Sequence, residues 1–223
     1  MITEIPIKIK INNALHIGSE IKEDENIDKP ILKKKSEYGV FIPYIPGNVL
    51  RGVLRRLGYN IYLKCINIFN PTANKSINFY GENIPPTELI QHPFFTLFGG
   101  PGIPSKIQYS EGSYNKEESS FISLMTGIKI NRISLSTQKT ALFTFERAEI
   151  SEIEFTLKVY DLNDREKALL ISALNGLKYS SIGGRITIGC GFIKDIEINK
   201  ESFVKDAMNC LQDLINKSKN NKN

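Results

Sequence analysis

Alternation of apolar and polar residues is the strongest pattern in the chain. Residues 5–11 read IPIKIKI, so that every second side chain is apolar. Successive side chains of a strand point to opposite faces, and the alternation therefore predicts a strand with one buried face. Residues 151–161, SEIEFTLKVYD, predict a second such strand. Residues 39–45 also have strand character, whereas residues 22–35, KEDENIDKPILKKK, are polar around a proline and predict a loop.

Apolar residues at helical spacing predict the main helices. The first helix starts directly after a Pro-Gly turn, with Asn48 as the expected N-cap. The clearest helix begins near residue 163, where Asn163 or Asp164 supplies the cap. Residues 201–215 predict a final helix, and a short helix is expected within residues 88–98, before two glycines.

The order of these elements predicts an α+β fold in a single domain, residues 1–223. Strands in two groups with crossing helices indicate a ferredoxin-like, RRM-type sheet with insertions, and such a sheet is a common platform for RNA. The inserted irregular region covers about 66–127. Residues of about 128–150 alternate in part around a polar centre, which predicts a protruding β-hairpin. The basic tail over about 216–223 is expected to fray.

Positive charge is clustered, although the net charge of the chain is only +5. Residues 41–64 hold four basic side chains and no acid, and residues 126–147 hold four against Glu146 alone. Such clusters suggest a polyanionic partner, and they also fit a solvated basic surface. The eight side chains are Arg51, Arg55, Arg56, Lys64, Lys129, Arg132, Lys139 and Arg147.

Two of these arginines share one face of the first helix. Arg51 and Arg55 are four residues apart and repel each other by roughly 0.2–0.5 kcal/mol. The N-terminus of a helix also favours an anion. A phosphate backbone would satisfy both features, and so would acidic residues from elsewhere in the fold.

Several classes of protein are excluded by what the sequence lacks. The three cysteines, Cys65, Cys190 and Cys210, are far apart and form neither a CxxC pair nor a zinc signature. The N-terminus is charged and alternating, unlike a signal peptide, and no apolar run approaches membrane-spanning length. We therefore expect a cytoplasmic protein with no membrane partner.

A second unusual stretch, IGGRITIGCGFI, is rich in glycine. Gly183, Gly184, Gly189 and Gly191 allow the backbone to approach another group closely. The spacing is neither GxGxxG nor a Walker loop, which argues against nucleotide binding. Tight β-turns explain the same glycines.

Six motifs follow one another along the chain. They are LHIGSE, NIDKPILKK, YIPGNVLRGVLRR, TLFGG, the stretch from GIKINR through ALFTFERAEI to EFTLKV, and IGGRITIGCGF. In this order, over about residues 5–195, they resemble the RAMP superfamily of CRISPR-associated proteins, and in particular the repeated backbone subunit of type III (Csm and Cmr) effector complexes. The resemblance implies a modified RRM fold whose hairpin is a thumb that splays RNA. It also implies a role in antiviral defence, with CRISPR RNA, target RNA, further copies of the chain and other RAMP subunits as partners.

The resemblance implies that Asp28 is catalytic. IDKP matches the family's loop motif, whose aspartate cleaves bound target RNA as an endonuclease. A lone carboxylate there would bind a divalent metal ion, Mg²⁺ or Mn²⁺, not tightly held, or position a ribose 2′-hydroxyl for in-line attack. The neighbouring acids at 23–25 are further candidates for gathering the metal. Without the resemblance, Asp28 would be interpreted as a turn-capping aspartate before Lys29-Pro30.

The resemblance also names residues that would bind RNA. The family commonly has Ser and Lys where this chain has Asn48 and Arg51, and both replacements keep hydrogen bonding or charge. In the glycine-rich loop Cys190 replaces the family's aromatic residue, which leaves backbone contacts and subunit packing open there. The RNA-binding candidates are Asn48, Arg51, Arg55 and Arg56 on the helix, Lys129, Arg132 and Lys139 on the thumb, and Arg185 in the glycine-rich loop.

His16 has two interpretations. Relatives that process CRISPR RNA use a histidine as general acid and base, but the LHIG motif is shared with subunits that do no processing, so we interpret His16 as structural or RNA-adjacent. His92 is interpreted as a packing residue. Three other functions stay open: a catalytically inactive structural subunit, a processing endoribonuclease that uses His16, and a ferredoxin-like protein unrelated to RNA.

Overall fold

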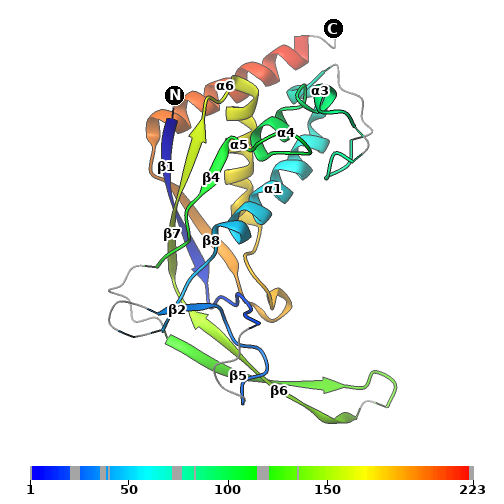
Figure 1. Ribbon diagram of the computed structural model, residues 1–223, viewed down its shortest axis with the longest axis vertical. Helices are drawn as coiled ribbons and strands as arrows, with labels where there is room; N and C mark the ends of the chain where they lie inside the picture. Colours follow the sequence, from blue (N-terminus) through cyan, green and yellow to red (C-terminus); the bar gives the residue numbers. More distant parts are fainter. Residues whose placement is uncertain are drawn as a thin grey trace.

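A four-stranded antiparallel sheet, in the order β4-β7-β1-β8, forms the centre of the computed structural model (Figure 1). β1 (Ile2–Asn12) lies between β7 (Glu152–Tyr160) and β8 (Phe192–Ile198), and β4 (Ile107–Tyr109) pairs with β7. The predicted α+β fold and both alternating strands are confirmed. The structure describes residues 2–20, 26–35, 39, 41–71, 77–82, 84–114, 121–134 and 136–220.

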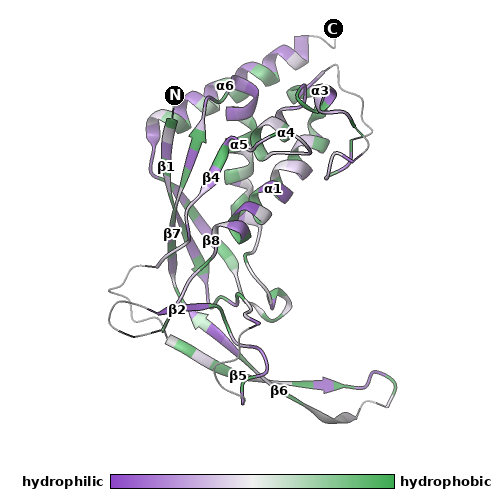
Figure 2. Ribbon diagram, viewed as in Figure 1, coloured by the Kyte–Doolittle hydropathy of each residue, from purple (hydrophilic) through white to green (hydrophobic). Residues whose placement is uncertain are grey.

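Helices cover one face of this sheet, and the core lies between the two layers. The helices are α1 (Gly47–Lys64) and α5 (Asp164–Gly176), with α6 (Glu201–Asn220) packed on α5. The isoleucines of residues 5–11 point into the core, and all four are buried. Figure 2 shows the same division as alternating apolar and polar colours along the strands. Burial of one face of each strand is therefore what orients the sheet toward the helices.

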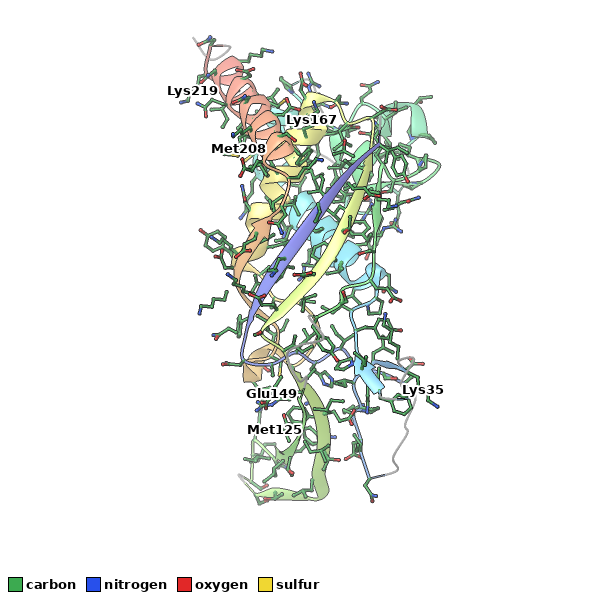
Figure 3. All side chains as sticks on the ribbon, turned by 90° about the vertical axis from the view of Figure 1, so that its left-hand side faces the viewer. Lys35, Met125, Glu149, Lys167, Met208 and Lys219 are labelled. Atoms are coloured by element: carbon green, nitrogen blue, oxygen red, sulfur yellow. The ribbon has the colours of Figure 1, made fainter. Side chains whose placement is uncertain are left out.

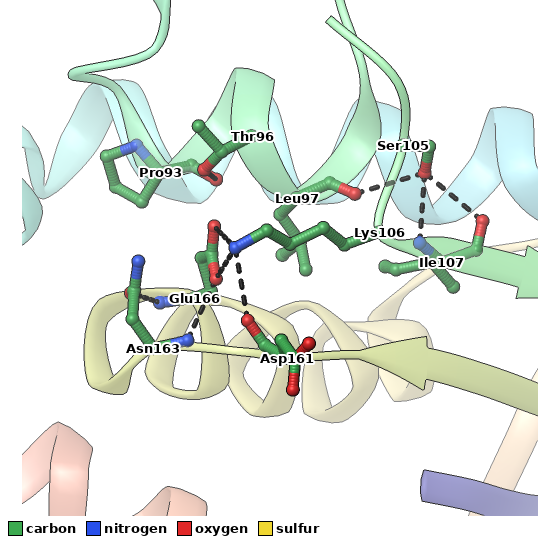
Figure 4. Close-up of polar contacts among 9 residues, drawn as sticks. All are labelled: Pro93, Thr96, Leu97, Ser105, Lys106, Ile107, Asp161, Asn163 and Glu166. Carbon is green, nitrogen blue, oxygen red and sulfur yellow. Dashed lines mark hydrogen bonds and ion pairs between the residues drawn. The ribbon is translucent and has the colours of Figure 1, made fainter. Parts of the chain in front are cut away.

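The start of α5 is fixed by side-chain hydrogen bonds (Figure 4). The side-chain oxygen of Asn163 accepts the Glu166 N–H at 3.0 Å, and the Glu166 carboxylate accepts the Asn163 N–H at 2.9 Å. This capping box confirms Asn163 as the cap. The Glu166 carboxylate is fully buried and pairs with the Lys106 ammonium at 2.8 Å. Because Lys106 directly precedes β4, the pair ties the edge strand to the helix.

Two predicted helix ends were wrong. The N-cap of α1 is Pro46, and Asn48 is an exposed residue of the first turn. The helix starts close to β4, since a Cβ atom on Gly47 would lie 2.8 Å from the Tyr109 carbonyl oxygen. α6 continues to Asn220, through most of the tail that was predicted to fray. Residues 221–223 lie outside the described part of the chain.

The region predicted to be irregular, 66–127, contains several regular elements. They are α2 (Ile66–Phe69), α3 (Pro86–Leu89), α4 (Pro93–Phe98), β4 and the first part of β5. The single short helix predicted over 88–98 is split at Pro93, which cannot donate a backbone hydrogen bond. Buried aromatic rings hold these short helices on α1, and the rings of Tyr62 and Phe94 stack 6.1 Å apart.

A long two-stranded hairpin projects from the sheet, as predicted (Figures 1 and 3). It consists of β5 (Phe121–Ile130) and β6 (Thr137–Glu149), so that it begins seven residues before the expected boundary at 128. Figure 3 places Met125 and Glu149 on it, well below the helices. A smaller pair, β2 (Lys33–Lys35) and β3 (Phe41–Pro43), shows that the end of the predicted loop 22–35 is a strand. Of two 3₁₀ turns, η1 (Leu177–Tyr179) precedes the glycine-rich loop and η2 (Ile186–Ile188) lies within it.

Candidate functional site

The structure brings three sequence motifs together at the base of the hairpin. The first is the Asp28 loop, residues 26–32, which runs beside β6. The second is the stretch 14–18, whose Leu15 bridges to Ala148 of β6. The third is the glycine loop, residues 182–191, which packs against 14–16. Segments more than a hundred residues apart in sequence thus meet around the last residues of β6.

Asp28 is exposed, and it is held on the hairpin by Thr144. One carboxylate oxygen, Oδ2, accepts the Thr144 N–H at 2.8 Å, while the Thr144 hydroxyl donates to the Asn26 carbonyl at 2.6 Å. Lys29 continues the pairing, because its N–H donates to the Thr144 carbonyl at 3.1 Å. Among the described residues, none forms a hydrogen bond or an ion pair with Oδ1. The hydrogen bonds to Thr144 therefore fix the backbone of Asp28, and Oδ1 of its carboxylate can bind another group.

Glu146 is the buried acid of this region. Its side chain is 5 % exposed, and Oε1 lies 2.9 Å from the Lys33 ammonium. Oε2 accepts the Ile31 N–H at 3.0 Å. A buried carboxylate needs such partners, because an unpaired charge in the interior is costly. Glu146 therefore holds the far end of the Asp28 loop.

His16 lies inside the cluster, with only 7 % of its surface exposed. Its Nδ1 is 2.7 Å from the Glu146 carbonyl oxygen, and because a carbonyl only accepts, Nδ1 carries the proton. Burial lowers the pKa of His16, and the positive charges of Arg185 and Lys29 lower it further, against the hydrogen bond to Glu146. The buried, hydrogen-bonded imidazole fits the structural one of the two interpretations made from the sequence.

The glycine loop approaches His16 through its backbone. The Gly184 N–H donates to the His16 carbonyl at 2.8 Å, and a Cβ on Gly183 would lie 2.4 Å from that oxygen. A Cβ on Gly191 would lie 1.9 Å from the Ile182 carbonyl oxygen. Close packing within the fold thus explains why glycine stands at positions 183 and 191. Gly189 differs, because a Cβ atom added there would have no neighbouring atom within 4 Å.

Arg185 extends from the glycine loop across the hairpin. Its guanidinium lies over the rings of Phe143 and Phe145, at 4.9 and 4.6 Å from their centroids. The two rings stand side by side on β6, 6.2 Å apart. The stack orients Arg185 over β6 at the base of the hairpin, and a cation held over aromatic rings can still bind an anion.

The four candidates on α1 divide into two groups. Asn48, Arg51 and Arg56 are exposed. Arg55 instead turns inward: its guanidinium donates to the carbonyls of Phe98, Gly99 and Phe79 and lies over two aromatic rings. Phe98 and Gly99 end α4, where carbonyls lack helical partners and a cation is favourable. The structure therefore gives Arg55 a structural partner, in place of the acid considered above.

Basic and apolar side chains are exposed on the hairpin. Lys129 and Arg132 are exposed near its end, and Lys139 lies on β6 with its side chain outside the described atoms. Arg147 is already ion-paired with Glu149 at 3.0 Å. Several large apolar side chains are also exposed, namely Leu124, Met125, Ile128, Ile130, Ile133 and Leu142. The hairpin thus offers both charge and apolar surface.

The open face of the central sheet is a poor platform for RNA. Its lysines pair with glutamates on neighbouring strands, as Lys8 does with Glu152 and Glu154 at 3.2 and 3.0 Å. Two further pairs are Lys10–Glu197 and Lys158–Glu4. A face whose cations are already neutralised gives little attraction for phosphate. Phosphate would have to compete with these glutamates for the lysines of the sheet.

The residues present could hold a metal ion only weakly. Asp28 supplies one free carboxylate oxygen, and the described residues contain no group of three or more His, Cys, Asp or Glu side chains placed around a common point. The acids Glu23, Asp24 and Glu25 lie outside the described residues. Mg²⁺ often binds through one carboxylate, waters and substrate phosphates, and Asp28 fits that mode.

Sequence analysis missed the residues that support Asp28. Thr144 and Glu146 lie in a strand of alternating residues. Of the two, only Glu146 is conspicuous in the sequence, because it is the single acidic residue in a basic segment. Phe143 and Phe145 looked like ordinary strand residues. Thr144 and Glu146 depend on partners more than a hundred residues away, and the two rings depend on Arg185 in the glycine loop, so the local pattern carries no signal for these roles.

Comparison with protein-family models identifies a family that this chain matches. The family model of the RAMP superfamily matches residues 8–194, most of the 223-residue chain and all three segments of the candidate site. A search of curated proteins finds no match. The described helices include none that is long and apolar enough to span a membrane.

Proposed function

The chain belongs to the RAMP superfamily, whose members have CRISPR-associated, RNA-binding roles, and from this premise we propose a specific activity. We propose that it is a backbone subunit of a type III effector complex, which binds CRISPR RNA and cleaves complementary target RNA in antiviral defence. The observation that carries the proposal is the exposed Asp28, fixed to the base of the hairpin by Thr144, with Arg185 stacked on the neighbouring β6 residues Phe143 and Phe145.

Binding is assigned to the exposed cations around the site. Arg51 and Arg56 on α1 and Lys129 and Arg132 on the hairpin are exposed and would contact phosphates. The exposed apolar side chains of the hairpin suit a wedge between bases, which splays the strand. Because phosphate contacts release counterions, affinity should fall steeply with salt.

Cleavage is assigned to Asp28. Its free oxygen would accept a hydrogen bond from the ribose 2′-hydroxyl and orient that group in line with the scissile phosphate. Alternatively, that oxygen and an RNA phosphate would hold a divalent ion, Mg²⁺ or Mn²⁺, which would supply charge stabilisation as a Lewis acid. Arg185 would hold the phosphate backbone beside the site.

Replacing Asp28 by alanine tests the assignment. In a complex assembled with guide RNA, Asp28→Ala should leave assembly and target binding unchanged and abolish target cleavage. Arg185→Ala is a useful comparison, because it should weaken binding and keep residual cutting. Cleavage at the wild-type rate by Asp28→Ala would remove the catalytic assignment.

One observation favours the alternative of an inactive structural subunit. The Asp28 carboxylate already accepts a backbone hydrogen bond from Thr144, which is what a purely structural aspartate does. In that case Asp28→Ala lowers stability and leaves cleavage by the complex unchanged. A processing endoribonuclease that uses His16 is less well supported, since the imidazole is buried and its Nδ1–H is taken by a backbone carbonyl.

A further inference from the structure

Glu146 connects β6 to two segments of the candidate site and to β2 through four polar groups. Its N–H donates to the Lys29 carbonyl at 3.0 Å, and its own carbonyl accepts from His16 at 2.7 Å. Its carboxylate accepts the Ile31 N–H at 3.0 Å and pairs with Lys33 at 2.9 Å. Every one of these contacts crosses from β6 to another part of the chain.

Burial makes these contacts strong. The side chains of Glu146 and Lys33 are 5 % and 10 % exposed, so neither charge is well solvated once the other is removed. The ion pairs on the open sheet face are more exposed, for example Lys10–Glu197 at 37 % and 43 %. An exposed pair contributes little, whereas breaking one partner of a buried pair is strongly unfavourable.

The contacts between β6 and the loop start at Asp28 and continue along the residues that follow it. Thr144, two residues before Glu146, binds Asp28 itself, and Glu146 binds the loop at Lys29 and Ile31. Side chains at 144 and 146 lie on the same face of β6, because strand side chains repeat every two residues. The Asp28 loop is therefore attached to the hairpin along one short line.

We infer that Glu146 is a positioning residue that fixes Asp28 to the hairpin, so that the hairpin and the cleaving carboxylate move as one unit. The inference rests on the proposed function. A hairpin seated correctly on RNA would then bring Asp28 to the phosphodiester, and a misplaced hairpin would withdraw it. Displacement of a catalytic group by about 1 Å costs about 10²-fold in rate.

The test compares Glu146→Gln with Glu149→Gln in the assembled complex. Both residues are glutamates of β6 paired with a cation, but Glu149 is exposed and touches neither the Asp28 loop nor His16 among the contacts described. Two quantities are measured: amide hydrogen exchange of segment 26–33, and the single-turnover rate of target cleavage with the dissociation constant for target RNA.

Glu146→Gln should speed exchange in segment 26–33 by about tenfold or more, because the loop opens locally. It should lower the cleavage rate by about tenfold to a hundredfold while the dissociation constant for RNA stays within about twofold. Glu149→Gln should change none of these. Lys33→Gln combined with Glu146→Gln leaves no unpaired buried charge and keeps the comparison possible if the single variant does not fold.

The outcomes separate the inference from the proposed function. Unchanged exchange in segment 26–33 of the single or double variant overturns the inference, whatever happens to cleavage. Faster exchange with an unchanged cleavage rate overturns the positioning role, if Asp28→Ala abolishes cutting. If Asp28→Ala cuts normally, the proposed function fails, and the exchange data still decide whether Glu146 fixes the loop. A loss of RNA binding equal to the loss of rate would indicate a general structural role and also overturn the inference.

Discussion

Arg55 provides a quantitative test of how the basic helix α1 is used. The guanidinium donates three hydrogen bonds to backbone carbonyls, at 2.9 Å to Phe98, at 3.2 Å to Phe79, and to Gly99. It also lies about 5 Å above two aromatic rings, those of Phe79 and Phe94. Arg55→Met keeps the apolar stem of the side chain and removes all of these contacts.

The expected loss follows from the kinds of contact. Hydrogen bonds from a charged donor contribute about 1.5–3 kcal/mol each, and cation–π contacts about 0.5–2 kcal/mol. Contacts made by one group are not additive, and the partly buried site is reached by some solvent. We therefore expect Arg55→Met to lower the free energy of unfolding by about 3–4 kcal/mol, which is roughly 10 °C in Tm for a chain of this size.

The assay is urea and thermal unfolding of the isolated chain, with Arg51→Met and Arg56→Met as controls. Both controls are exposed on the same helix and should change stability by at most about 0.5 kcal/mol. RNA binding by the assembled complex should show the reverse pattern: the controls weaken it and flatten its salt dependence, and Arg55→Met has little effect. A stability loss below about 1 kcal/mol for Arg55→Met, with RNA affinity reduced as in the controls, would refute the structural role.

Three further predictions concern the fold. Gly191→Ala should destabilise the chain by more than about 2 kcal/mol in urea unfolding, because its φ of 74° and the carbonyl 1.9 Å from the new Cβ both oppose a side chain; near-neutral stability would contradict this. Burial lowers the pKa of both His16 and His92 below the ordinary value of about 6.5, so the unfolded chain takes up protons first as the pH falls through that value. Tm should therefore fall between about pH 7 and pH 5, and a Tm that rises toward acid would exclude the neutral buried histidines. Lys106→Met leaves the fully buried Glu166 carboxylate without its cation and should cost about 3 kcal/mol in urea unfolding at pH 7; a loss below about 1 kcal/mol would show that the ion pair contributes little to stability.

The candidate site shows where prediction from sequence stopped. Asp28 and the glycine loop were found as motifs, and the structure brings both to the base of the hairpin. The sequence grouped Arg55 with Arg51, because helical spacing places them on one face of α1. Whether Arg51 or Arg55 is exposed to solvent depends on where α4 packs. The sequence of α1 does not predict that position. The roles of Thr144 and Glu146 likewise could not be predicted from the sequence.

The sequence by itself determined the local elements of this protein. The alternation in β1 and β7, the capping box of α5 and the existence of the hairpin follow from backbone geometry and from side chains within a few residues of one another. The tertiary structure alone decided which polar groups meet. Glu146 binds Ile31 across 115 residues, and Thr144 binds Asp28 across 116. Such contacts form only when the sheet and its insertions pack together. Packing buries these polar groups, and a buried polar group is stable only if a hydrogen-bond partner lies close to it in the folded chain.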